Sequence, residues 1–351
     1  PTVNALFTKG FIQLLTTAPG LYRLAYNQAE IPGRWAGIKH SSLGTMGRVM
    51  WPKLLPLLTR FRPDAILCTH PFPLGAMAEM RRRGLLPVPL AGVLTDFAPH
   101  SFWVHEGVDH YYVAAPEMVA AMGEQGVEPA QVTVTGIPVR RAFADAPSRT
   151  EAARLLGLDP LRPTVLIMGG GLGLGPMREI VAEVSRTALP LQILAVTGHN
   201  HRLYEQLQPL AAAAQGGPTA VHLYEYVPYV QTLMAASDLL VTKAGAVTAS
   251  EALTMGLPML LVDPIPGHEE RNQELLVAAG AARAVSAPPE IPAVLSALAQ
   301  NPAMLAQMRT AALRLGQPAA AVQVIHHVAG LVRHDAIAVP GLIPQEQVCT
   351  A

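Results

Sequence analysis

Between residues 164 and 286, short apolar runs alternate with segments of helical composition, and this alternation restricts the fold more than any other feature. Each run is long enough for one buried strand and is followed by a turn of glycine or polar residues. The runs are 165–168, 191–197, 221–223, 239–241 and 259–262. Strands that alternate with helices through short turns form a parallel sheet covered by helices on both faces. We therefore expect an α/β domain over residues 164–316.

The N-terminal half carries a second, smaller set of the same kind. Apolar runs at 65–69, 89–95 and 109–113 alternate with helical segments at 74–83 and 116–125. The span 146–163, with three prolines around a short helical piece, is predicted to be a linker. The expected organisation is an N-terminal domain over 1–145, the linker, the domain over 164–316, a helix at 317–335 and a tail at 336–351.

The composition excludes several classes of protein. The formal net charge is +0 and the isoelectric point is near 7.6, so the chain lacks the basic excess that neutralises nucleic-acid phosphates. Hydrophobic residues make up 50% and mean hydropathy is +0.29, yet no apolar run approaches the ~18–20 residues that span a bilayer. Cys68 and Cys349 are too few for a disulfide framework or a metal site, which fits a reducing compartment.

Arginines cluster at 60/62, 81–83 and 140–141. Solvated faces are the default interpretation of such clusters, and contact with an anionic membrane surface is the alternative.

The stretch 242–252, Thr-Lys-Ala-Gly-Ala-Val-Thr-Ala-Ser-Glu-Ala, follows an apolar run and leads into a helical segment at 249–255. Such a turn leaves the first helical amides without intrahelical partners at the positive end of the helix dipole, which suits a phosphate or diphosphate. Thr248 is expected to cap the helix, and Glu251 is suited to accept hydrogen bonds from a ribose diol. An ordinary turn, with Thr248 as a cap and Glu251 in solvent, is the alternative on these residues alone.

Two further segments follow predicted strands. The run 259–262 leads into the polar cluster 263–273, at the strand end where open α/β sheets bind ligands. The run 165–168 leads into a glycine loop at 169–175, whose amides can approach a ligand because no Cβ intervenes. By itself this loop is a weak signal, because it lacks the ending of a Walker loop and the acidic residue of a dinucleotide site.

Together and in this order, the segments 169–176, 242–252 and 263–273 resemble the nucleotide-sugar domain of the monogalactosyldiacylglycerol synthase and processive diacylglycerol glucosyltransferase family. This family is related to the peptidoglycan lipid-intermediate N-acetylglucosaminyltransferase. The resemblance covers nearly the whole chain. It implies the α/β fold called GT-B, in which two Rossmann-like parallel-sheet domains face a cleft and the last helix returns to the first domain.

The resemblance also implies roles in a donor site. The glycine loop would lie near the diphosphate and the cleft, Ala246–Thr248 would bind phosphate, and His268, Glu269 and Asn272 would face the sugar hydroxyls. Glu251 would hold the ribose. The residues carried over are Gly170, Gly171, Gly173, Ala246, Val247, Thr248, Glu251, His268, Glu269 and Asn272.

The segment 95–106 matches the acceptor side of the family. Asp96, Trp103 and His105 correspond to an Asp, a Trp and a His, although the chain is about one residue shorter between the Asp and the Trp. That difference leaves the role of His100 open. Asp96 and His105 are the catalytic candidates, with Asp96 as the general base or its orienting partner. The alternative keeps Trp103 in the core and the histidines on the surface.

Residues 1–27 are predicted to be helical, with an apolar side that includes Phe7 and Tyr26. A core helix and a lipid-binding surface helix both fit this pattern. Family members begin with a strand and a glycine-rich turn that contains a histidine. The match implies that these parts, and with them a rival catalytic base, are missing from the given sequence, which leaves the activity of the chain as given open.

The expected activity is an inverting transfer of a hexose to diacylglycerol by a peripheral protein at the cytoplasmic face of the cell membrane. The partners would be UDP-galactose or UDP-glucose, a diacylglycerol-type lipid and an anionic membrane surface, without nucleic acid. No cofactor or metal is expected, because loop amides and a helix dipole can stabilise the diphosphate and the chain has no Asp-x-Asp motif. The alternatives are a UDP-N-acetylglucosaminyltransferase acting on a peptidoglycan lipid, a non-hydrolysing UDP-sugar epimerase and a non-catalytic UDP-sugar or lipid binder.

Overall fold

The computed structural model describes residues 51, 52, 54–187 and 189–332. The expectations for residues 1–27 and for the tail at 336–351 fall outside this range. The described residues divide into two compact units. The N-terminal unit comprises 51–137 and 319–332, and the C-terminal unit comprises 138–318. The chain therefore passes between units at 137/138 and at 318/319, whereas the sequence suggested a linker at 146–163.

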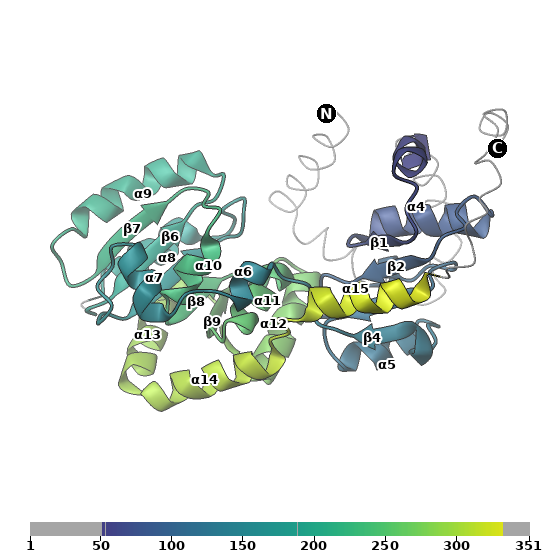
Figure 1. Ribbon diagram of the computed structural model, residues 1–351. Helices are drawn as coiled ribbons and strands as arrows, with labels where there is room; N and C mark the ends of the chain where they lie inside the picture. Colours follow the sequence, from purple (N-terminus) through teal and green to yellow (C-terminus); the bar gives the residue numbers. More distant parts are fainter. Residues whose placement is uncertain (1–50, 53, 188, 333–351) are drawn as a thin grey trace. The chain divides into compact units, whose positions relative to one another are not determined.

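The N-terminal unit is built on a four-stranded parallel sheet whose strands lie in chain order. The strands are β1 (Ile66–Cys68), β2 (Leu90–Val93), β3 (His110–Val113) and β4 (Val132–Val134). The helices, labelled in part in Figure 1, are α4 (Pro71–Arg82), η1 (Ser101–Trp103), α5 (Glu117–Gly123), η2 (Pro129–Gln131) and α15 (Ala320–Leu331). β2 is buried along its whole length, as expected for a strand covered on both faces.

The last of the described helices, α15, packs on this sheet (Figure 1). Two of its valines, one turn apart, join residues of β2 and β3 in one buried cluster: Ala91, Val93, Tyr112, Val324 and Val328. The Tyr112 hydroxyl and Nδ1 of His327 are hydrogen-bonded at 2.8 Å. Because the apolar stripe of α15 is buried on β2 and β3, this helix completes the core of the N-terminal unit.

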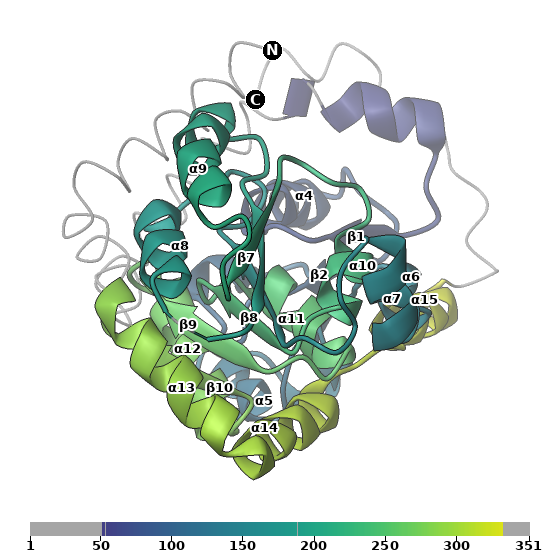
Figure 2. The same ribbon diagram turned by 90° about the vertical axis from the view of Figure 1, so that its left-hand side faces the viewer.

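The C-terminal unit contains a six-stranded parallel sheet in the order β10-β9-β8-β5-β6-β7. Its strands are β5 (Thr164–Met168), β6 (Gln192–Val196), β7 (Ala220–Tyr224), β8 (Leu239–Thr242), β9 (Met259–Val262) and β10 (Ala282–Val285). Its helices are α6 (Arg141–Ala144), α7 (Arg149–Leu155), α8 (Met177–Ser185), α9 (His201–Ala213), α10 (Val230–Ala235), α11 (Ala246–Thr254), α12 (His268–Ala278), η3 (Pro288–Glu290), α13 (Ile291–Gln300) and α14 (Pro302–Leu315). Figure 2 shows α8 and α13 on one side of this sheet and α7 and α10 on the other.

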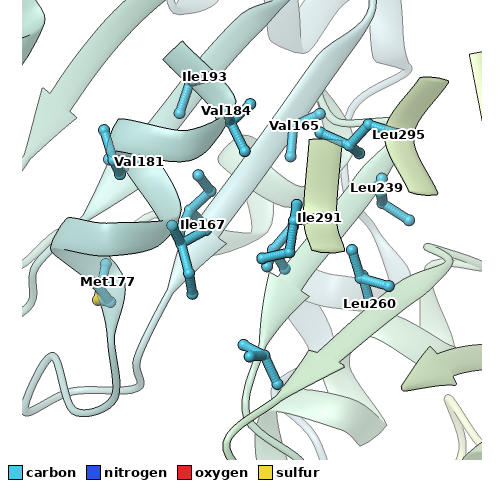
Figure 3. Close-up of a cluster of buried hydrophobic side chains, with 14 of the residues drawn as sticks. Val165, Ile167, Met177, Val181, Val184, Ile193, Leu239, Leu260, Ile291 and Leu295 are labelled. Carbon is cyan, nitrogen blue, oxygen red and sulfur yellow. The ribbon is translucent and has the colours of Figure 1, made fainter. Parts of the chain in front are cut away.

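The main core of this unit lies between the sheet and the helices α8, α13 and α14. Val165 and Ile167 of β5 point to this face, where they meet Val181 of α8 and Ile291 of α13 (Figure 3). Leu166, between them in the strand, is equally buried. A strand buried on both faces requires an uninterrupted apolar run, which is why the sequence predicts it so clearly.

The strand order places a switch point between β5 and β8. The chain proceeds from β5 outward through β6 and β7, then returns to the other side of β5 and proceeds outward through β8, β9 and β10. In sheets of this kind ligands bind outside the carboxyl ends of the strands that flank the switch point. Here those two ends carry the glycine loop 169–175 and the turn 243–245.

Candidate functional site

The glycine loop after β5 is folded back on itself by backbone hydrogen bonds. The amides of Gly173 and Leu174 donate to the carbonyls of Gly170 and Gly169, each over 3.0 Å. A Cβ on Gly169 would overlap the backbone of Leu174, and a Cβ on Gly173, where φ is +55°, would overlap the carbonyl of Thr197. The packing of the loop therefore requires glycine at both positions.

Gly170 and Gly171 face open space instead, since a Cβ on either would have no atom within 4 Å. The carbonyl of Gly171 accepts a hydrogen bond of 2.9 Å from the amide of His199, which ties the loop to the turn after β6. Of the three glycines predicted to lie near a diphosphate, Gly173 shapes the loop, while Gly170 and Gly171 leave room for a ligand.

The turn after β8 leads directly into α11, which begins at Ala246 with Gly245 as its N-cap. Thr248 lies inside the first turn, so the expectation that it caps the helix is wrong. The first helical hydrogen bond runs from Ala249 N to the carbonyl of Gly245 over 2.9 Å, which leaves the amides of Ala246, Val247 and Thr248 without intrahelical partners. Because the N-cap glycine has no side chain that could accept from them, these amides can donate hydrogen bonds to an external anion.

Glu251 lies one turn further along α11 and is half-buried. Burial raises the pKa of its carboxyl to about 7, and the positive charge of Arg140 opposes the shift. The Arg140 guanidinium itself donates to the carbonyl of Pro228 over 3.4 Å. A partly desolvated carboxyl of this kind can accept hydrogen bonds from hydroxyl groups that replace its water. Its predicted contact with a ribose fits this position and stays a prediction.

The polar cluster after β9 leads into α12, whose first residue is His268. Glu269 is 3% exposed and forms an ion pair with Lys243, with Nζ and Oε1 2.6 Å apart. Its second oxygen accepts a hydrogen bond of 2.8 Å from the amide of Ile265. Asn272, which is fully buried, donates from Nδ2 to the carbonyl of Ala244 over 3.1 Å.

Glu269 and Asn272 therefore tie α12 to the turn after β8. Both side chains were expected to face sugar hydroxyls. In the structure both are buried, and their contacts connect α12 and the loop before it to the turn after β8. Direct contact of His268, Glu269 or Asn272 with a sugar stays a prediction.

Two features of this edge were not predicted from the sequence. One is the ion pair of Lys243 with Glu269. To predict it, one would have to know that these residues, 26 positions apart in the sequence, become neighbours in the fold. The other is a stacked pair of rings, His199 after β6 and Tyr226 after β7, with centroids 4.4 Å apart and planes inclined by 11°. Tyr226 is 58% exposed. The sequence did contain one indication of this pair: Tyr226 lies just beyond the end of a predicted strand and does not continue its apolar run.

In the N-terminal unit, the segment 95–106 connects β2 to β3. Asp96 lies three residues beyond β2 and is partly exposed. His100 is 5% exposed and caps η1, with Nδ1 accepting a hydrogen bond of 3.1 Å from the amide of Phe102. Trp103 is 3% exposed. Trp103 therefore lies in the core, as the alternative interpretation expected. The same interpretation placed His100 on the surface, and this is wrong because His100 is buried. Contact of Trp103 with an acceptor stays a prediction.

His105 is held between α4 and β3. Its ring lies over Gly75 of α4, where a Cβ would come within 2.9 Å of Cε1 and 3.0 Å of Nε2. The Tyr111 hydroxyl accepts from the His105 amide over 3.0 Å and donates to the His105 carbonyl over 3.2 Å. Burial raises the pKa of Tyr111 to about 12, so this hydroxyl keeps its proton at neutral pH.

Within residues 54–187 and 189–332, no three side chains of His, Cys, Asp or Glu are grouped to hold a metal ion. The expectation of a metal-independent site stays a prediction. The same part of the chain contains no helix of the length and apolarity needed to cross a membrane.

Comparison with known proteins matches both halves of the chain. Residues 2–139 match the family model of monogalactosyldiacylglycerol (MGDG) synthase, and residues 164–324 match the glycosyltransferase family 28 C-terminal domain. A processive diacylglycerol beta-glucosyltransferase of Bacillus licheniformis is 32% identical over 257 residues, covering 73% of this chain and 66% of the relative. One of Bacillus thuringiensis is 28% identical over 93% of this chain and 81% of the relative. The chain thus spans about two thirds of the length of the former.

Solved structures share the fold at low sequence identity. MurG of Acinetobacter baumannii superposes with a TM-score of 0.59 at 18% identity, covering 83% of this chain and 78% of that one. MnaA of S. aureus, solved with UDP, gives a TM-score of 0.61 at 15% identity, covering 82% and 80%. These similarities confirm two Rossmann-like parallel-sheet domains. With the family matches over both halves, they show that the chain belongs to the monogalactosyldiacylglycerol synthase and processive diacylglycerol glucosyltransferase family of GT-B glycosyltransferases.

Proposed function

We propose that this protein transfers a hexose from a UDP-sugar to diacylglycerol at a membrane surface. The observation that carries the proposal is the pairing, at the switch point of the six-stranded sheet, of an open glycine loop with an uncapped helix N-terminus. Both offer backbone amides to an anion, and a nucleoside diphosphate is the anion that this kind of sheet edge commonly binds.

The other groups at this edge suit the remaining parts of a UDP-sugar. The stacked rings of His199 and Tyr226 form an exposed platform for a planar base. Glu251 lies one turn beyond the proposed phosphate amides and would accept hydrogen bonds from the ribose. The start of α12, at His268, would then lie beside the sugar.

The proposed reaction is a single displacement with inversion. Asp96 takes the proton of the acceptor hydroxyl, and that oxygen attacks the anomeric carbon. The bond from this carbon to the β-phosphate oxygen breaks, and UDP leaves with its charge stabilised by the amides of Ala246, Val247 and Thr248. The curated relatives are named glucosyltransferases, which favours glucose as the sugar, with galactose as the second candidate.

Action at the anionic inner surface of the cell membrane, as a peripheral protein, is part of the proposal. Residues 54–61 are helical, and this helix exposes Leu57 and Phe61, at 50% and 68%. The Arg60 guanidinium lies 5.4 Å from the centre of the Phe61 ring. An exposed apolar face beside arginines favours the interface of an anionic bilayer.

The test is UDP release from UDP-glucose and from UDP-galactose, with and without vesicles that contain diacylglycerol and anionic lipid, while the lipid products are analysed in parallel. We expect release that depends on diacylglycerol and the appearance of a glycosyl-diacylglycerol. Asp96→Asn should reduce turnover by at least about 100-fold, the usual contribution of a general base, with UDP binding preserved. UDP binding without turnover would contradict the proposal in favour of a binding protein, and interconversion of a UDP-sugar without acceptor would favour an epimerase.

A further inference from the structure

Strand β8 has an ion pair at each end, and the two pairs differ in burial. At its beginning, the carboxylate of Asp238 pairs with Arg149 over 2.7 Å, with side chains 24% and 31% exposed. At its end, Lys243 pairs with Glu269 over 2.6 Å, and the exposures fall to 14% and 3%. The more deeply buried pair therefore lies at the carboxyl edge of the sheet.

Stability alone is a weak reason for burying this pair. The loss of water around two charges offsets most of their attraction, so apolar side chains of similar size often serve a core equally well. Lysine is also uncommon in this chain: of its 25 lysines and arginines, the lysines are Lys9, Lys39, Lys53 and Lys243. A lysine contributes a compact point charge where an arginine would impose a planar fork.

The pair joins the two segments of the donor site. Glu269 receives the Lys243 ammonium on one oxygen and the Ile265 amide on the other, so one carboxylate holds the turn after β8 and the loop after β9. An added Cβ on Gly245 would lie 3.6 Å from that carboxylate, so the N-cap of α11 lies beside it. A shift of Lys243 would thus move the loop before α12 relative to the first amides of α11.

We infer that Lys243 is a positioning residue of the donor site, which acts through Glu269 to hold the sugar side of the site in register with the diphosphate side. This inference rests on the proposed function. Lys243 is not required to touch the donor. Its effect is on the sugar part of the donor, because the diphosphate amides belong to the turn that carries Lys243 itself.

The test compares Lys243→Met, Lys243→Arg and the matched control Arg149→Met in the full chain. Calorimetry gives the Kd of UDP and of UDP-glucose, and the vesicle assay gives kcat and KM. For Lys243→Met we expect kcat/KM to fall by about 10- to 100-fold, as a displacement of about 1 Å can produce. The Kd of UDP should change by less than about threefold. Lys243→Arg keeps the positive charge but brings a planar fork to a buried position, so it should recover only part of the loss. Arg149→Met should lower Tm but leave kcat/KM within about threefold of wild type.

A Lys243→Met protein with unchanged kcat/KM, or an equal loss in Arg149→Met, would overturn the inference. If the wild type turns over no donor, the proposed function fails separately, and the inference is then decided by binding. In that case Lys243→Met must weaken UDP-glucose more than UDP. An unchanged ratio of the two Kd values, or the absence of UDP binding by the wild type, overturns it.

Discussion

The ring of His327, on the last helix, lies against the ring of His110 in β3, with centroids 4.3 Å apart. His110 is buried, and its Nε2 lies 2.8 Å from the hydroxyl of Thr133. Burial, and to a lesser extent the charge of His327, lower the pKa of His110 to about 4, while Asp109 opposes the shift. The contact that docks α15 on the sheet therefore depends on His110 remaining neutral.

This contact predicts that the N-terminal unit loses stability in mild acid. The folded-state pKa of His110 lies below the ordinary value of 6.5, so the unfolded chain binds the proton more readily. The contribution of this group is fully present above pH 6.5 and is lost as the pH falls through the window from about 6.5 to about 4. Urea unfolding at several pH values should show His110→Asn to be less stable at pH 7 and less sensitive to acid than the wild type. Parallel curves for the two proteins would contradict the prediction.

Glu251 predicts the opposite dependence for the C-terminal unit. Its folded-state pKa of about 7 lies above the ordinary 4.5, so its contribution to stability is fully present below pH 4.5 and is lost as the pH rises through 7. Glu251→Gln removes the cost of burying a carboxylate. We expect the variant to have the higher Tm at pH 8 and nearly the same Tm as the wild type at pH 5.

The same substitution should weaken nucleotide binding. A neutral amide accepts hydrogen bonds from hydroxyls less strongly than a carboxylate, and hydrogen bonds to charged groups contribute about 1.5–3 kcal/mol. The Kd of UDP should therefore rise about tenfold or more at pH 8 in Glu251→Gln. A lower Tm together with unchanged UDP affinity would show that Glu251 supports the fold and not the ligand.

In the glycine loop, the residues that shape the loop differ from those that leave room for a ligand, so the two roles can be tested separately. In Gly173→Ala the new Cβ would overlap the Thr197 carbonyl, and the residue would keep a φ of +55°. Overpacking of this kind lowers stability by roughly 1–3 kcal/mol. Gly171→Ala meets no atom, so thermal unfolding should be almost unchanged, while its methyl group enters the space proposed for the diphosphate. We expect a lower Tm only for Gly173→Ala and weaker UDP binding for both. A Gly171→Ala protein that binds UDP like the wild type would place the diphosphate elsewhere.

The strands and the class of fold were predictable because buried parallel strands leave uninterrupted apolar runs, as at 239–241 and 259–262. The order of the strands was not, since nothing in β5 states that β8 will be its neighbour. The helix start was displaced for a local reason: Gly245 takes the N-cap position, and the helix begins three residues before the expected 249.

The site was predictable in outline because each candidate segment follows a strand, and parallel strands end at one edge. The burial of particular side chains was not, because it depends on tertiary packing. Lys243 and Glu269 belong to different motifs, and their ion pair follows only from the sheet order. The same holds for Gly75: that a side chain there would collide with the ring of His105 is evident only from the folded structure.

Gly75 provides a test of His105 that leaves the histidine itself unchanged. In Gly75→Ala, the new Cβ would lie 2.9 Å from Cε1 of His105, so the ring has to move. Alanine in a helix interior is favoured over glycine by about 1 kcal/mol, which offsets the cost of that movement. We therefore expect a Tm close to that of the wild type and turnover reduced by about tenfold or more, if the ring position matters for the acceptor.

The matched control is Gly123→Ala, at the end of α5 in the same unit, where a Cβ would meet no atom. It should keep full turnover. Full turnover in Gly75→Ala as well would exclude a catalytic role that depends on the present position of His105, and would leave Asp96 as the single candidate of the two. A loss in both variants would instead trace the effect to helix stability, because only Gly75 lies under the ring.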